Sequence, residues 1–155
     1  MYCEPGRIFC RSKKIMLAVD GNERSARAAT VAFEIAEMTG SELHIMHVIP
    51  LGSVQQLALM TDDDVNEIKV KYTKNGNTLV EGYKKAAEEF GIKVELILDE
   101  GLPSDRIIAY ANDSQMDLVV IGARGESVGK RKVMGSATER VANSCKKPIQ
   151  SWTSL

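Results

Sequence analysis

Asp117-Leu-Val-Val-Ile121 runs directly into Gly122-Ala-Arg-Gly125 and, nine residues later, into Gly135-Ser136. The apolar run predicts a buried parallel strand, and the residues after Gly135 have helical character with a capping box formed by Ser136 and Glu139. Glycines let backbone N–H groups approach an anion without a Cβ in the way, and a helix N-terminus adds unpaired donors and a positive dipole end. This order of strand, glycine-rich loop and helix predicts an α/β fold with a candidate phosphate site.

Strand-like and helix-like segments alternate along the rest of the chain. Asn22 can cap a helix that Gly40 closes, whereas the segment around Gly52-Ser53 is rich in turn residues and predicts a loop. The expected strands are 13–20, 42–50, 92–98, 117–122 and 148–153, and the expected helices are 23–39, 62–90, 105–114 and 135–144. Asn75-Gly76-Asn77 and Gly82 weaken the longest helix, so a kink is expected there. The alternation predicts a parallel sheet with right-handed crossovers and helices on both faces.

Composition narrows the class of protein. The 155 residues fit one domain, which we place at residues 13–155 behind an N-terminal extension at 1–12 that lacks the pattern of a secretory signal. Basic and acidic residues number 20 and 21, so no global field favours nucleic acid or an anionic membrane as a partner. The apolar runs are too short to span a bilayer. Three cysteines without a C-x2-C pair argue against a zinc site and a disulfide framework, so a reducing cytoplasm is expected.

Asp20 is the second element of the candidate site. In open α/β sheets, ligands collect beyond the carboxyl ends of the strands where the strand order reverses. If the strands that end at Asp20 and at Gly122 are neighbours, a carboxylate faces the glycine-rich loop across one crevice. Asp20 would then accept hydrogen bonds from a ribose hydroxyl or an adenine amine. Taken alone, Asp20 is equally well read as a turn residue that caps the first helix.

Other motifs are weaker. Lys130-Arg131-Lys132 could screen a triphosphate or could be a solvated loop, and the sequence leaves both open. The spacing fits neither a P-loop nor a G-x-G-x-x-G fingerprint. His44 and His47 lie three residues apart on a predicted strand, so they should face opposite sides and cannot jointly bind a metal. We assign no catalytic or metal-binding residue.

These residues resemble the universal stress protein family, in its ATP-binding branch, whose signature is G-x2-G-x9-G-[ST]. The match covers about residues 13–149 and includes the first two predicted strands. The resemblance implies an adenine nucleotide alpha hydrolase-like fold: a single open parallel five-stranded sheet in the order 3-2-1-4-5. It also implies that Asp20 and the backbone at Val48 hold the adenosine. The residues that would hold ribose and phosphates are Gly122, Gly125, Gly135 and Ser136, with Arg124 and Ala137 adjacent to them.

The expected function is regulatory ATP binding, with ADP or AMP as alternative ligands and Mg²⁺ bound with the nucleotide. The bound nucleotide would tune self-association or partner contacts. Hydrolysis would be slow at most, because phosphoryl transfer needs an in-line nucleophile, a group that orients it and charge stabilisation, and the sequence shows only the last of these. A partner-activated ATPase or adenylyl-transferring enzyme and a nucleotide-free scaffold remain open. A homo-oligomer is expected, although the polar end Pro148–Leu155 departs from the valine run with which this family pairs that strand in a dimer.

Overall fold

The computed structural model describes residues 13–122, 125–128, 131–134, 140–141 and 149–152. Its elements are β1 (Lys14–Ala18), α1 (Glu23–Thr39), β2 (Glu42–Pro50), α2 (Leu51–Thr61), α3 (Val65–Glu88), β3 (Val94–Gly101), α4 (Pro103–Asp113), β4 (Leu118–Gly122), β5 (Gly125–Val128), β6 (Arg131–Met134) and β7 (Ile149–Trp152). In this part of the chain, strands β3-β2-β1-β4-β7 form one sheet in that order, and each neighbouring pair is parallel. The predicted α/β class is confirmed.

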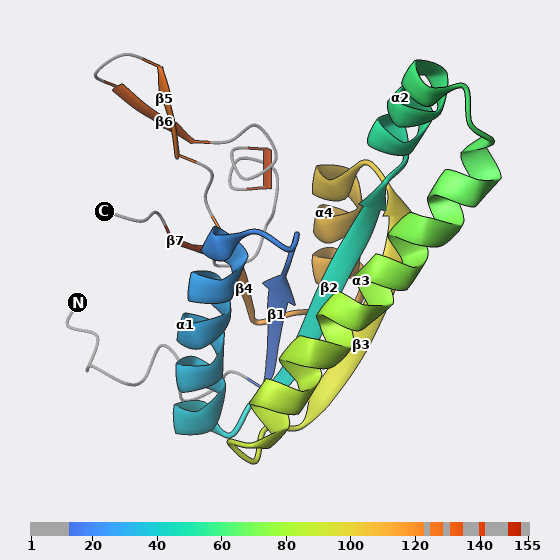
Figure 1. Ribbon diagram of the computed structural model, residues 1–155. Helices are drawn as coiled ribbons and strands as arrows, with labels where there is room; N and C mark the ends of the chain where they lie inside the picture. The colour runs from blue at the N-terminus through green and yellow to red at the C-terminus, as the bar shows by residue number, and fades with distance from the viewer. Residues whose placement is uncertain (1–12, 123–124, 129–130, 135–139, 142–148, 153–155) are drawn as a thin grey trace.

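Helices cover both faces of this sheet (Figure 1), because the strands are apolar on both faces. On β1, Ile15 and Leu17 pack in a cluster with α1 and α3, whereas Met16 and Ala18 pack with α4 on the other face. Ile15, Met16 and Leu17 are fully buried. The central strands of the sheet therefore form the middle of three layers.

Helix α1 begins after the capping residue Asn22 and ends before Gly40, as the sequence predicts. The Asn22 side chain accepts hydrogen bonds from the backbone N–H groups of Arg24 and Ser25, at 2.9 and 3.2 Å. At the other end Gly40 has a φ of 66°, the left-handed conformation that glycine adopts at helix C-termini. The prediction of residues 23–39 is confirmed.

The region after β2 differs from the prediction. Residues expected to form a loop around Gly52-Ser53 form helix α2, because Val54 and Ala58 share one helical face and pack on Ile49 and Ile68. The helix predicted for 62–90 starts later, at Val65, with the Asp64 side chain accepting from the Asn66 N–H at 2.7 Å.

The long helix α3 runs without a break through its glycines. A Cβ on Gly76 would lie 2.8 Å from Cδ2 of His47 and 3.0 Å from Cδ1 of Leu98. Gly76 is therefore present because α3 lies directly against the sheet at this point, and the kink expected from the sequence does not form.

Residues between the signature glycines were expected to be a loop. In the structure β5 and β6 pair as a separate antiparallel ribbon. Of the helix predicted for 135–144, residues 140 and 141 are described and are helical, and the others lie outside the described residues. Within the described ranges, no helix is both long enough and apolar enough to cross a membrane.

Candidate functional site

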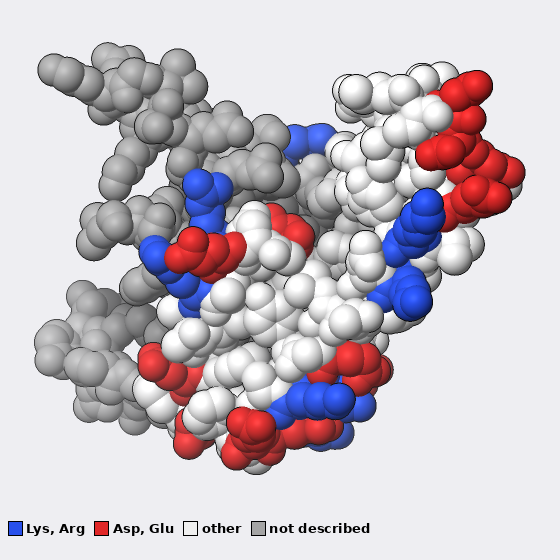
Figure 2. Space-filling view, viewed as in Figure 1, with Lys and Arg blue, Asp and Glu red and all other residues white. Residues whose placement is uncertain are grey.

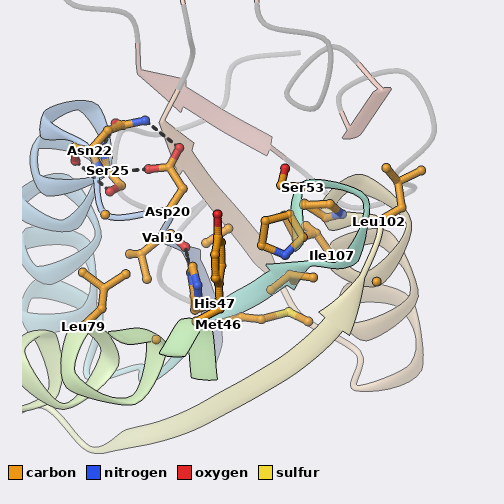
Figure 3. Close-up of a pocket in the computed structure, with 18 of the residues that line it drawn as sticks. Val19, Asp20, Asn22, Ser25, Met46, His47, Ser53, Leu79, Leu102 and Ile107 are labelled. Carbon is orange, nitrogen blue, oxygen red and sulfur yellow. Dashed lines mark hydrogen bonds between the residues drawn. The ribbon is translucent and has the colours of Figure 1, made fainter. Parts of the chain in front are cut away.

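A cavity of about 1010 Å³ opens at the carboxyl ends of β1, β2 and β4 (Figure 3). Its floor is apolar and comes from both sides of the sheet edge. Ala18, Val48 and Ile121 belong to the cluster on the α4 side, whereas Val19 and Leu79 belong to the cluster under α1 and α3. Such a volume, with an apolar floor and a few polar groups at its rim, suits a small organic ligand.

The parallel register brings these strand ends together. Ala18 is opposite Met46 of β2 and Ile121 of β4, so the residues that follow each strand emerge at one edge. In the order β3-β2-β1-β4-β7, the chain continues from β1 to β2 on one side and from β4 to β7 on the other, so the order reverses between β1 and β4. The cavity therefore lies in a crevice of the kind in which open α/β sheets bind ligands.

Asp20 lies on the rim of this cavity and is exposed. Its carboxylate accepts a hydrogen bond from the backbone N–H of Asn22 at 3.1 Å and another from the Asn22 side-chain amide at 2.6 Å (Figure 3). The turn-capping role weighed in the sequence analysis is therefore present. A carboxylate has about four lone-pair sites, and these hydrogen bonds between described residues occupy two of them.

Gly122 follows β4 and also lines the cavity. A Cβ at this residue would lie 3.0 Å from the backbone carbonyl of Arg24 and 3.1 Å from the backbone nitrogen of Ser25. The absence of a side chain thus allows the first turn of α1 to pack against the end of β4. This turn is held in place by the Ser25 hydroxyl, which donates to the Asn22 carbonyl at 2.9 Å.

The structure brings together three of the predicted site residues, because Asp20, Val48 and Gly122 line the same cavity. Gly125 begins β5 on the chain that continues from β4. Arg124, Gly135, Ser136 and Ala137 lie outside the described residues. Of the predicted cations, Arg131 and Lys132 begin β6, and Lys130 is likewise outside the described part.

Sequence reasoning missed the wall that α2, α3 and the start of α4 contribute. Leu51, Gly52 and Ser53 line the cavity from the first turn of α2, which had been read as a loop. The other residues missed include Tyr72 and Asn75 of α3, and Leu102, Pro103 and Ile107 at the start of α4. The residues at the starts of α2 and α4 had one signal, their proximity in sequence to the strand ends Pro50 and Gly101, which finish at the same edge. Tyr72 and Asn75, in the middle of α3, had no such signal.

His47 belongs to this wall, and His44 does not. The Nδ1 atom of His47 is 2.8 Å from the carbonyl oxygen of Val19, and a carbonyl only accepts, so Nδ1 carries the proton. His44 lies on the other face, where its Nδ1 is hydrogen-bonded to the Tyr110 hydroxyl at 2.8 Å. The prediction that the two histidines face opposite sides is confirmed.

The environment of His44 shifts its titration. Burial lowers the pKa of His44 below its usual value, and the nearby charge of Glu42, whose Oε1 is 3.7 Å from Nε2, counteracts only part of this shift. His44 is therefore a neutral structural residue beneath α4. In the described part of the chain, no group of three or more His, Cys, Asp or Glu side chains is placed to hold a metal ion.

Comparison with known proteins gives one consistent result. The model of the universal stress protein family matches residues 11–149. Universal stress protein YxiE of Bacillus subtilis is 29% identical over 141 residues, which cover 88% of this chain and 95% of that protein. Among solved structures, that of protein MJ0577 superposes on this chain with a TM-score of 0.77 at 28% sequence identity. The matched region covers 90% of this chain and 94% of the MJ0577 chain, and MJ0577 is a universal stress protein of Methanocaldococcus jannaschii.

Two more distant structures share the fold and contain adenine nucleotides. A universal stress protein from Archaeoglobus fulgidus in complex with dAMP has a TM-score of 0.64 at 21% identity, with 90% of this chain and 96% of that chain covered. A universal stress protein in complex with cAMP has a TM-score of 0.62 at 22% identity, with 91% and 96% covered.

Proposed function

The chain belongs to the universal stress protein family, and on this premise we propose that it is a regulatory protein that binds ATP in the cavity at the ends of β1, β2 and β4. The observation that carries the proposal is the meeting of Asp20, Val48 and Gly122 around one cavity. Asp20 follows β1, Val48 lies in β2 and Gly122 ends β4, where it opens the glycine signature. The adenine nucleotides in two structures of the same fold support the ligand class.

Each residue has a role in this proposal. The adenine lies on the apolar floor and is read by the backbone at Val48, and Asp20 accepts hydrogen bonds from the ribose hydroxyls. Gly122, Gly125, Gly135 and Ser136 hold the ribose and the phosphates, and Arg124 and Ala137 lie adjacent to them in sequence. Mg²⁺ would accompany the triphosphate and offset part of its negative charge. Donors to charged oxygens contribute about 1.5–3 kcal/mol each, so the glycines dominate the affinity.

The proposed affinity follows from ligand size. ATP has roughly thirty heavy atoms, and at about −0.3 kcal/mol per atom a well-made site gives about −9 kcal/mol, which corresponds to a Kd near or below a micromolar. Nucleotide would then be retained during purification. Hydrolysis is slow at most, because efficient transfer also needs a group that orients the attacking nucleophile in line. A homo-oligomer and a location in the cytoplasm stay predictions.

Mass analysis of the supernatant of heat-denatured, freshly purified protein tests the proposal. An adenine nucleotide in about stoichiometric amount is expected, and its absence, together with no uptake of added ATP, would refute ATP binding. Turnover of ATP measured with and without cell extract then separates a regulatory binder from a partner-activated ATPase.

A matched pair of glycine variants tests the role of the signature. Gly125→Val places a branched side chain at the start of β5 and should abolish most nucleotide binding. Gly82→Val is the control, since a Cβ at Gly82 meets nothing within 4 Å and the residue lies on the exposed side of α3, away from the cavity. Unchanged affinity in Gly125→Val would contradict the assigned role.

A further inference from the structure

The turn between α2 and α3 presents large apolar side chains to solvent. Leu59 and Met60 are 86% and 77% exposed at the end of α2, and Val65 is exposed at the start of α3. Helix α2 and the beginning of α3 lie at the upper right of the molecule, beyond the ends of the strands (Figure 1). The two residues that α2 buries, Val54 and Ala58, lie on its other side.

Exposed carboxylates surround these apolar residues. Figure 2 shows their negative charge gathered at the upper right of the molecule, over the junction of α2 and α3. They are Asp62, Asp63, Asp64 and Glu67. Among the ion pairs between described residues, none involves these four, and the nearby Lys69 ammonium instead lies 2.7 Å from Glu100. The three apolar residues and these four acidic residues are called the α2–α3 surface below.

Helix α2 has few stabilising features of its own. Pro50 precedes it without a side-chain cap, its first turn has no acidic residue and its last turn has no basic one. It ends at Asp62, a non-glycine residue with a φ of 56°. The carboxylates that follow suit the start of α3, which Asp64 caps, but they stand at the negative dipole end of α2. A cation placed at this surface would remove that conflict.

The same helix reaches the candidate nucleotide site. Its first turn, Leu51 to Ser53, lines the cavity, while its last turn carries Leu59 and Met60. A ligand whose contacts with the first turn favour its helical form would therefore stabilise the helix whose far end forms the exposed surface. Such a coupling is reciprocal: a partner bound at the far end must raise nucleotide affinity by the same factor.

We propose that the α2–α3 surface docks an amphipathic helix of a partner protein, with apolar residues on one face and lysines or arginines along its edges, and that nucleotide in the cavity strengthens this docking through α2. The apolar face of such a helix covers Leu59, Met60 and Val65, and its cations meet the four carboxylates, which form no ion pair with another described residue. A neutral apolar partner would leave these charges uncompensated at the rim, and an acidic one would be repelled. The docking depends on the surface alone, and only the coupling rests on the proposed function.

Fluorescence anisotropy with a labelled synthetic helical peptide, leucine on one face and lysine on the others, tests the docking. The full-length protein should bind it, with affinity falling as salt is raised. Leu59→Ser combined with Met60→Ser should weaken binding at least about tenfold, since it removes two large apolar contacts. Met38→Ser is the matched control, because Met38 is 80% exposed on α1, outside this surface, and its loss should change nothing. Asp62→Asn with Asp63→Asn should reduce the salt dependence.

Three results would overturn the docking: equal binding of a peptide with glutamate in place of lysine, an equal loss in Met38→Ser, or self-association of the protein that disappears in the double serine variant. The last would assign the surface to a second copy of the chain. ATP added to nucleotide-stripped protein should raise peptide affinity, and an unchanged affinity despite measured ATP binding would overturn the coupling. If the protein binds no ATP at all, the proposed function fails while the docking result stands.

Discussion

Two glycines within α3 offer a direct test of how this helix meets the sheet. Gly76 and Gly82 both lie in the interior of the helix, where glycine is unfavourable. They differ in their surroundings. A Cβ at Gly76 would lie 2.8 Å from the ring of His47, whereas a Cβ at Gly82 would meet nothing within 4 Å. Replacing each by alanine therefore changes the same chemistry in two environments.

The expected free energies follow from these distances. Alanine gains about 0.8–1 kcal/mol over glycine in a helix interior, so Gly82→Ala should raise the free energy of unfolding by about that amount. At Gly76 the same gain is opposed by overpacking against His47 and Leu98, which costs about 1–3 kcal/mol. Gly76→Ala should thus range from no net change to a loss of about 2 kcal/mol. The two variants should differ by about 1–3 kcal/mol.

Urea denaturation followed by circular dichroism measures both values, and equal m-values would show that the unfolded states are comparable. If Gly76→Ala stabilises the protein as much as Gly82→Ala does, α3 does not rest on His47 and the wall of the cavity is wrongly placed. A loss at Gly82 would instead contradict the exposure of that face of the helix.

Three further predictions concern the first helix, the end of β4 and a buried histidine. Asn22→Ala should lower the free energy of unfolding by about 1 kcal/mol, because two N–H groups lose their acceptor, and a urea titration showing no change would contradict the cap. Gly122→Ala should cost about 1–3 kcal/mol, since its Cβ meets the backbone of Arg24 and Ser25, whereas Gly52→Ala, with nothing within 4 Å, serves as control. Burial lowers the pKa of His44 below its unfolded value of 6.5, so the folded state binds fewer protons and stability should fall as pH drops below 6.5 toward the folded pKa. His44→Gln should make the free energy of unfolding less dependent on pH just below pH 6.5. If the pH dependence is unchanged, it comes from another titrating group.

Much of the fold was predictable because its signals are local. The bounds of α1 follow from Asn22 and Gly40, which act through hydrogen bonds within one turn of the chain. Strands β1, β2 and β4 were predictable because they are apolar on both faces, as a covered parallel sheet requires, whereas β3 was predictable from its alternation of apolar and polar residues. The order of the strands came instead from the family resemblance, since no local pattern specifies which strands are neighbours.

The errors fall where packing overrides local preference. Gly52-Ser53 favours a turn by itself, but burial of Val54 and Ala58 makes this segment a helix. Gly76 predicts a weak point in α3. In the structure, the absence of a side chain at Gly76 instead lets the helix lie close to His47 of the sheet. These two errors concern packing between different helices and strands, which the residues of one segment do not specify.

The sequence alone determined the alternation of strands and helices, the ends of α1 and the residues that follow β1 and β4, because each depends on hydrogen bonds and apolar patterns within a few residues. Only the tertiary structure decided that Asp20, Val48 and Gly122 share one cavity and that α2 and α3 complete its wall. The reason is that the parallel register sets which strand ends meet, and close packing sets how near each helix comes. Neither the strand register nor the distance between helix and sheet is determined by one segment of the chain alone.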